Sequence, residues 1–179
     1  MLLLSLLFFS GCEDEQKRAS FKEQQPTSMK PKEMKFLLKD ANKTAITIEL
    51  KNSTISLSPT NNITLLFFFT TWCPSCKAQI PELIKLEKKF KDIKIIGILL
   101  NKPQDIQTFL QHYSIDFFVS TSYKTNTIVA DKIYKFIKAP ASMPVPAIII
   151  LHKNRYFRHY LGAVPLAILQ ADIKALKEE

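Results

Sequence analysis

Residues 71–76 read Thr71-Trp72-Cys73-Pro74-Ser75-Cys76 and join a strand-like apolar run to a stretch with helical periodicity. A cysteine is nucleophilic only as the thiolate, and the first turn of a helix offers unpaired N–H groups and the positive end of the helix dipole. We therefore expect a lowered pKa for Cys73. Because Cys76 follows by nearly one helical turn, its thiol can form a disulfide with Cys73. Pro74 suits the first helical position, where its missing N–H is not needed.

The segments on either side of this motif alternate between strand and helix patterns. The run 63–70 is apolar on both faces, which is typical of a strand in the middle of a covered sheet. Residues 74–91 have apolar side chains at helical spacing, and 93–100 form a second apolar strand. Further along the chain, the patterns predict helices at 106–113, 126–137 and 166–176, and strands at 117–119, 147–151 and 156–161.

This order of elements predicts the fold class. Strands that alternate with helices indicate an α/β protein with a parallel core and helices on both faces, extended by an antiparallel edge. Lys153-Asn154 suits the turn of a hairpin at that edge. The segments 36–38, 46–50 and 54–57 cluster β-forming residues, and they predict an N-terminal β-hairpin or small strands.

Composition limits the chain to one domain and a few classes of partner. It has 179 residues, 46% of them hydrophobic, which is enough for one buried core. The net charge is +9, but the lysines are spread singly along helix-like stretches and are not interleaved with aromatic residues. We therefore expect a solvated basic surface and no nucleic-acid partner. Three cysteines are too few for a disulfide framework. As for oligomeric state, we expect a monomer.

The first residues have the pattern of an export signal. Residues 2–9 are apolar apart from Ser5, and this run is too short for a membrane-spanning helix, which needs about 20 residues. It fits the apolar region of a signal peptide. The following Ser10-Gly11-Cys12 resembles the lipobox of bacterial lipoproteins, and that resemblance implies lipidation of Cys12. Phe9 stands where Leu is usual, and no Lys or Arg precedes the run. An ordinary signal sequence is the alternative, and either one takes the chain out of the cytoplasm.

A polar segment separates Cys12 from the predicted domain. Residues 13–33 are rich in Gln, Pro and charged residues and have almost no apolar periodicity. Such a segment cannot bury enough surface to offset the entropy of ordering it. The sequence therefore predicts three parts: a signal peptide of lipoprotein type at 1–11, a lipid-anchored flexible tether at 12–33, and a domain at 34–179.

The motif and its surroundings resemble the thioredoxin superfamily, specifically the TlpA-like branch of membrane-anchored, extracytoplasmic members that includes the ResA and CcmG types. The stretch 72–76 matches the active-site motif, and Pro81 matches the proline that kinks the active-site helix. Val145-Pro146-Ala147 matches the family's cis-proline segment. The resemblance covers Phe36 to the C-terminus. It implies a thioredoxin fold, with a central mixed sheet flanked by helices.

The resemblance also implies roles for individual residues. Cys73 would be the exposed attacking thiol and Cys76 the buried resolving thiol. Pro146 would lie against the disulfide in the cis form, and Val145 would offer backbone hydrogen bonds to an extended substrate segment. Pro144 competes with Pro146 for this role. Trp72, Pro74 and Ser75 would support the site, with Trp72 packed beside it.

One position departs from the family pattern. Many TlpA-like members have a Glu three residues after the second cysteine, where it can tune the thiol pKa or carry a proton. Here that position is Gln79, and an amide cannot accept a proton. Glu82 is only a weak substitute.

The expected activity is thiol-disulfide oxidoreduction without a cofactor. The residues between the cysteines include no His, which in strongly oxidising relatives stabilises the reduced form. We therefore expect a reductant of disulfides in exported proteins, with electrons from a membrane donor of the DsbD or CcdA type. The resemblance suggests apocytochrome c as a substrate. An oxidant or isomerase of the same fold, and a non-catalytic lipoprotein binding module, are the alternatives.

Other chemistries of a cysteine pair fit the sequence less well. A structural zinc site needs four ligands, and His112, His152 and His159 are not spaced to supply them. Copper delivery of the Sco type uses a longer spacing between its cysteines. Peroxidase chemistry would fit Thr70, three residues before Cys73, but Leu66 replaces the expected proline. We therefore expect no metal.

Overall fold

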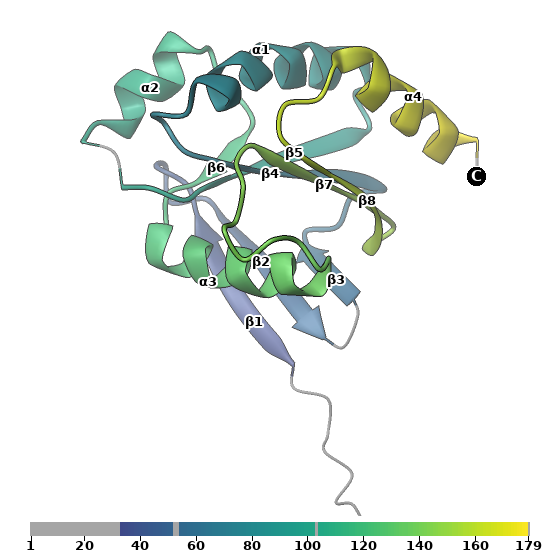
Figure 1. Cartoon of the computed structure of the whole chain (residues 1–179), viewed down its shortest axis with the longest axis horizontal. Coiled ribbons are helices and arrows are strands. Elements are labelled where there is room, and N and C mark those ends of the chain that lie inside the picture. The colour runs from purple at the N-terminus through teal and green to yellow at the C-terminus, as the bar shows by residue number, and fades with distance from the viewer. Residues whose placement is uncertain (1–32, 52–53, 103, 179) are drawn as a thin grey trace, which may run out of the picture. The chain divides into compact units, whose positions relative to one another are not determined.

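A computed structural model of the chain describes residues 33–51, 54–102 and 104–178 (Figure 1). The predicted signal peptide at 1–11, the lipidation site Cys12 and all of the predicted tether except Glu33 lie outside the described residues. They stay predictions.

A mixed sheet of five strands forms the centre of the described domain, in the order β6-β5-β4-β7-β8. The bounds are Ile63–Phe69 for β4, Ile93–Leu99 for β5, Phe118–Ser120 for β6, Ala147–His152 for β7 and Arg155–Leu161 for β8. Strand β4 is parallel to β5, and β5 is parallel to β6. Strand β7 is antiparallel to both of its neighbours, β4 and β8. The predicted parallel core with an antiparallel edge is confirmed.

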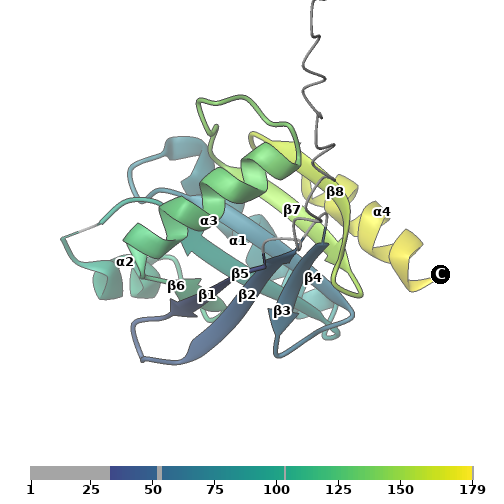
Figure 2. The same ribbon diagram turned by 90° about the horizontal axis from the view of Figure 1, so that it is seen from below.

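Helices cover both faces of this sheet, as predicted. Helices α1 (Pro74–Lys89), α2 (Ile106–His112) and α4 (Leu166–Lys177) lie over one face, and α3 (Tyr123–Phe136) lies over the other (Figures 1 and 2). The observed bounds differ from the predicted ones by a few residues at helix ends, the largest difference being at the start of α3. There Tyr123 to Thr125 are helical although they do not follow the apolar pattern.

A second, smaller sheet precedes the central one. Strands β1 (Met34–Lys39), β2 (Ala45–Lys51) and β3 (Thr54–Ser58) pair antiparallel in the order β1-β2-β3. The three β segments predicted at 36–38, 46–50 and 54–57 are therefore confirmed, and together they form one small sheet. Every second residue of β2 and β3 is buried, so one face of this sheet is covered.

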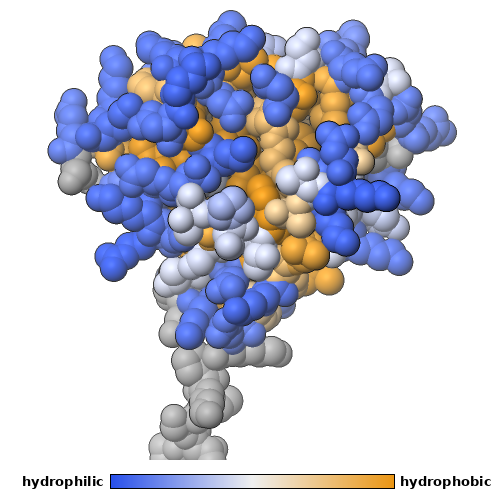
Figure 3. Space-filling view, turned by 180° about the vertical axis from the view of Figure 1, so that it is seen from behind, coloured by the Kyte–Doolittle hydropathy of each residue, from blue (hydrophilic) through white to orange (hydrophobic). Residues whose placement is uncertain are grey.

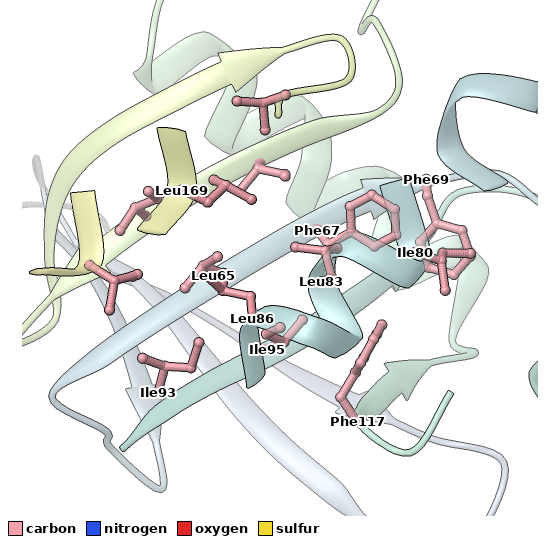
Figure 4. Packing of buried hydrophobic residues seen from close by; sticks show 14 of the residues in the cluster. Leu65, Phe67, Phe69, Ile80, Leu83, Leu86, Ile93, Ile95, Phe117 and Leu169 are labelled. Carbon is pink, nitrogen blue, oxygen red and sulfur yellow. The ribbon is translucent and has the colours of Figure 1, made fainter. Parts of the chain in front are cut away.

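The apolar residues of β4 divide between two cores. Leu65, Phe67 and Phe69 face α1 and α4, where Phe67 and Phe69 stack with ring centroids 4.8 Å apart (Figure 4). Leu66 and Phe68 face α3 and the small sheet. All seven residues of β4 are buried, which explains why its sequence has no polar alternation. The strand is thus fixed on both faces directly before the Cys73 motif.

The surface of the described domain is mostly hydrophilic on the side shown in Figure 3, with apolar patches between the polar side chains. Within the part of the chain that the structure describes, none of the helices has the length and apolar character needed to cross a bilayer.

Candidate active site

Cys73 occupies the N-cap position of α1, directly after the loop that leaves β4. Its backbone is extended, with φ −75° and ψ 117°, and Pro74 is the first helical residue, as predicted. The Cys73 Sγ atom accepts a hydrogen bond from the backbone N–H of Cys76 at 3.1 Å. A sulfur at this position thus satisfies one of the unpaired N–H groups at the helix start.

Two further groups lie against the Cys73 sulfur. The Ser75 hydroxyl oxygen is 3.2 Å away, and the Val145 carbonyl oxygen is 3.8 Å away. Because the first turn of α1 and the segment before β7 both cover it, Cys73 is only 4% exposed. The expectation of an exposed attacking thiol is therefore wrong for this structure.

The hydrogen bonds around Cys73 favour its thiolate. Burial raises the pKa of Cys73, but hydrogen bonds from the Cys76 thiol, the Ser75 hydroxyl and the backbone N–H groups of both residues lower it by more. The pKa is therefore lowered from the ordinary value, as the sequence predicted. The negative form of the sulfur is stabilised mainly by donors of the first helical turn.

Cys76 is in the opposite state. It is fully buried, as predicted, and burial together with its hydrogen bond to Cys73 raises the pKa of Cys76 to about 12. The two thiols are not joined by a disulfide in this structure. The pair therefore consists of one sulfur favoured as the thiolate and one favoured as the thiol, within hydrogen-bonding distance of each other.

The segment facing Cys73 contains a cis peptide bond between Val145 and Pro146. Pro146, and not its competitor Pro144, therefore matches the family's cis-proline. The other cis bond of the described residues, between Ser58 and Pro59, follows β3 and was not expected. The carbonyl oxygen of Val145, directly before this bond, is the atom of the segment that lies beside the Cys73 sulfur.

Trp72 does not pack beside the site as the sequence suggested. Its side chain is 67% exposed. The loop around it is held instead by Asn101, whose Oδ1 accepts from the Thr71 N–H and whose Nδ2 donates to the Thr71 hydroxyl, both at 2.9 Å. Asn101 follows β5 by two residues, so it lies at the edge where the parallel strands end. That position could have marked it as a candidate.

Gln79, which replaces the family's Glu, and its weak substitute Glu82 both have partners other than the cysteines. Gln79 is buried and forms two hydrogen bonds with the backbone of Val164. Glu82 pairs with Lys85 at 2.9 Å on the surface of α1.

Sequence reasoning also missed Tyr134, a buried residue of α3 whose hydroxyl donates to the Pro144 carbonyl at 2.7 Å. As for metals, no three His, Cys, Asp or Glu side chains of the described ranges come together as a binding site would require.

The mixed sheet, the dithiol at the start of α1 and the facing cis-proline define a thioredoxin-like α/β protein with a dithiol site. A comparison with sequence families agrees with this class. The chain belongs to the AhpC/TSA family, whose sequence model matches residues 37–160. This range includes the whole central sheet except the last residue of β8, and both site cysteines.

Individual proteins resemble the chain more distantly. It is 26% identical over 118 residues to the thiol-disulfide oxidoreductase ResA of Halalkalibacterium halodurans, covering 64% of this chain and 62% of ResA. The chain thus spans less than two thirds of that relative. A putative thiol:disulfide interchange protein DsbE from Chlorobium tepidum matches with a TM-score of 0.60 and 19% identity, over 82% of this chain and 96% of the other. A secreted Mycobacterium tuberculosis disulfide oxidoreductase matches with a TM-score of 0.53 and 17% identity, over 78% and 95%. These structural matches confirm the thioredoxin fold.

Proposed function

We propose that the protein is an extracytoplasmic thiol-disulfide oxidoreductase that reduces disulfides in exported proteins through Cys73 and Cys76. One observation carries this proposal. The Cys73 sulfur accepts the N–H of Cys76 at the start of α1, while the partner thiol is buried one turn further on. This arrangement supplies both a nucleophile and a second sulfur to release it.

The reaction begins with the Cys73 thiolate. It attacks one sulfur of the substrate disulfide, so that a mixed disulfide forms and the other substrate sulfur leaves as a thiolate. The Val145 backbone, beside the Cys73 sulfur, pairs with the substrate chain during this step. Main-chain pairing selects extended segments with little regard to their sequence.

Resolution needs the proton of Cys76 to leave. Burial is the largest cause of the raised pKa of Cys76, and the hydrogen bond and charge of Cys73 add to it. Those two contributions end once Cys73 is bonded to the substrate, so the pKa of Cys76 then falls. The proton passes to the substrate thiolate released in the first step. The Cys76 thiolate then attacks Cys73, the protein disulfide forms, and the second substrate sulfur leaves as a thiolate.

The proposal includes the place where this occurs. A signal peptide at 1–11 would direct export, and the lipidated Cys12 with the tether at 12–33 would hold the domain at a bacterial membrane outside the cytoplasm. The similar M. tuberculosis disulfide oxidoreductase is a secreted protein, which supports an extracytoplasmic site. A membrane protein of the DsbD or CcdA type would return two electrons to the Cys73–Cys76 disulfide. Exported proteins with disulfides, such as apocytochrome c, would be the substrates.

The test is reduction of insulin by the purified full chain, with dithiothreitol as the electron source. Cys73→Ser is expected to abolish the activity. Cys76→Ala is expected to accumulate mixed disulfides, and those that it forms in cells identify the natural substrates. Cys12→Ala is the matched control, because it replaces a cysteine outside the dithiol site and is expected to leave insulin reduction unchanged. A wild-type chain without activity would favour the non-catalytic binding module instead.

A further inference from the structure

In the segment opposite Cys73, the carbonyl groups of the three consecutive residues 144–146 each face a different part of the fold. The Pro144 oxygen accepts a hydrogen bond from the Tyr134 hydroxyl at 2.7 Å. The Val145 oxygen lies 3.8 Å from the Cys73 sulfur, and the Pro146 oxygen accepts from the Gly162 N–H at 2.7 Å. The substrate-pairing residue Val145 is therefore flanked on both sides by carbonyls that other parts of the fold hold in place.

This segment depends on such outside donors. Residues 137–146 form neither helix nor strand, so the regular backbone hydrogen bonds of such elements do not fix them. Pro144 and Pro146 have no backbone N–H, which leaves Val145 with the only amide donor of the three. The hydrogen bonds from Tyr134 and Gly162 are consequently the fixed points on either side of the Val145 backbone.

Tyr134 is itself rigidly placed. It is 2% exposed in the core between α3 and the central sheet, and its ring packs edge-on against Phe68 of β4 at 5.5 Å. Phe68 belongs to the strand that leads into the Cys73 motif. Burial, followed by the charge of Cys76, raises the pKa of Tyr134, so its hydroxyl stays protonated and can donate throughout the neutral range. One strand therefore positions both the nucleophile and, through Tyr134, the facing segment.

We propose that Tyr134 is a positioning residue for substrate binding, whose hydroxyl holds Pro144 so that the Val145 backbone is presented to a polypeptide disulfide beside Cys73. This role rests on the proposed function and deepens it. It separates two properties of the site: attack by Cys73 on any disulfide, and pairing of the Val145 backbone with a polypeptide. Only the second property depends on Tyr134.

The test compares two disulfides and two Tyr→Phe variants of the reduced full chain. One disulfide is a small aromatic compound without a peptide backbone, and the other closes a short peptide. Tyr134→Phe keeps the ring against Phe68 and removes the hydroxyl. It is expected to lower kcat/KM for the peptide about fivefold, mainly through KM, as the loss of one buried hydrogen bond implies. The rate with the small disulfide is expected to stay within about twofold of the wild type. Tyr123→Phe, on the same helix but away from the segment, should change neither rate.

Several outcomes would overturn this role. An unchanged rate with the peptide disulfide would remove it, and so would an equal loss with both disulfides, which would show a general structural defect. A wild-type chain that reduces neither disulfide would overturn the proposed function and this role together. Failure of the function is thus distinguished from failure of the role by the wild-type measurement alone.

Discussion

The side chain of Gln79 binds both polar backbone groups of Val164. Its Nε2 donates to the Val164 carbonyl at 3.1 Å, and its Oε1 accepts from the Val164 N–H at 2.7 Å. The bond joins the active-site helix α1 to the loop before α4, across 85 positions of sequence. Because it lies one turn after Cys76, it fixes the part of α1 that carries the dithiol.

Replacing Gln79 by Ala is expected to lower the free energy of unfolding by about 2 kcal/mol, because a buried N–H and a buried C=O lose their partners. Urea denaturation followed by circular dichroism measures this change. A loss below about 0.5 kcal/mol would mean that water replaces the amide at no cost.

Replacing Gln79 by Glu makes the stability depend on pH. The protonated carboxyl can still donate to the Val164 carbonyl and accept from its N–H, but the ionised form faces the carbonyl with a negative charge. Its pKa is therefore raised in the folded state. The stabilisation is present in full below the unfolded pKa of about 4.3, and is lost as pH rises through the folded pKa. Unfolding in urea at several pH values tests this trend. The variant should lose more stability with rising pH than the wild type, in which burial and the nearby Asp116 raise the pKa of Glu87.

Ser75 is expected to tune the reactivity of Cys73. Its hydroxyl lies 3.2 Å from the sulfur and contributes to lowering the pKa of Cys73. Ser75→Ala removes that donor, so the pKa rises and a smaller fraction of Cys73 is ionised at neutral pH. The pH profile of alkylation by iodoacetamide should shift to higher pH. Ser56→Ala on β3 is the control, and a profile equal to the wild type in both variants would remove Ser75 from this role.

Asp172 ties helix α4 to strand β8. Asp172 is only 6% exposed. Its carboxylate accepts a hydrogen bond from the Arg158 guanidinium at 2.9 Å and another from the Tyr160 hydroxyl at 2.5 Å. Asp172→Asn removes the charge and turns one acceptor into a donor, so we expect a loss of about 2 kcal/mol in unfolding free energy. Thermal and urea unfolding measure it.

The control for Asp172 is the exposed pair of Asp92 and Lys177, whose charged atoms lie 3.0 Å apart. Asp92→Asn removes a carboxylate of the same kind from a solvent-exposed position, where ion pairs contribute little. An effect of Asp92→Asn as large as that of Asp172→Asn would contradict the importance of burial.

Sequence reasoning succeeded where the information is local. The uninterrupted apolar run of β4, the cysteine spacing and the Val145-Pro146 segment each lie within a few residues, and each was found in the structure as predicted. The prediction that the Cys73 thiol is exposed was wrong, because the Val145 carbonyl that covers its sulfur lies 72 positions away in the sequence.

The residues that sequence reasoning missed act across long separations. Asn101 holds Thr71 from 30 positions away. Tyr134 reaches Pro144 across an irregular segment, so no helical or strand period relates the two residues. Polar side chains that bond to a distant backbone leave no repeating pattern, and only the three-dimensional pairing reveals them.

Asn126 offers a last test of such long-range polar pairing, at the edge of the sheet where β5 and β6 end. It is fully buried, and its Nδ2 donates to the carbonyls of Leu99 at 2.8 Å and Ser120 at 2.9 Å, while its Oδ1 accepts from the Ser120 hydroxyl at 2.6 Å. Asn126→Leu keeps a similar volume but leaves these three groups unpaired. We expect it to lower the free energy of unfolding by about 3 kcal/mol.

The same substitution at an exposed site, Asn42→Leu, should change stability by less than about 0.5 kcal/mol. Because Asn126 connects α3 to the strand ends beside Asn101, its loss should also speed hydrogen exchange in β6 more than in β7, which β4 and β8 enclose. Equal exchange in both strands, with unchanged stability, would mean that apolar packing of α3 alone holds this edge.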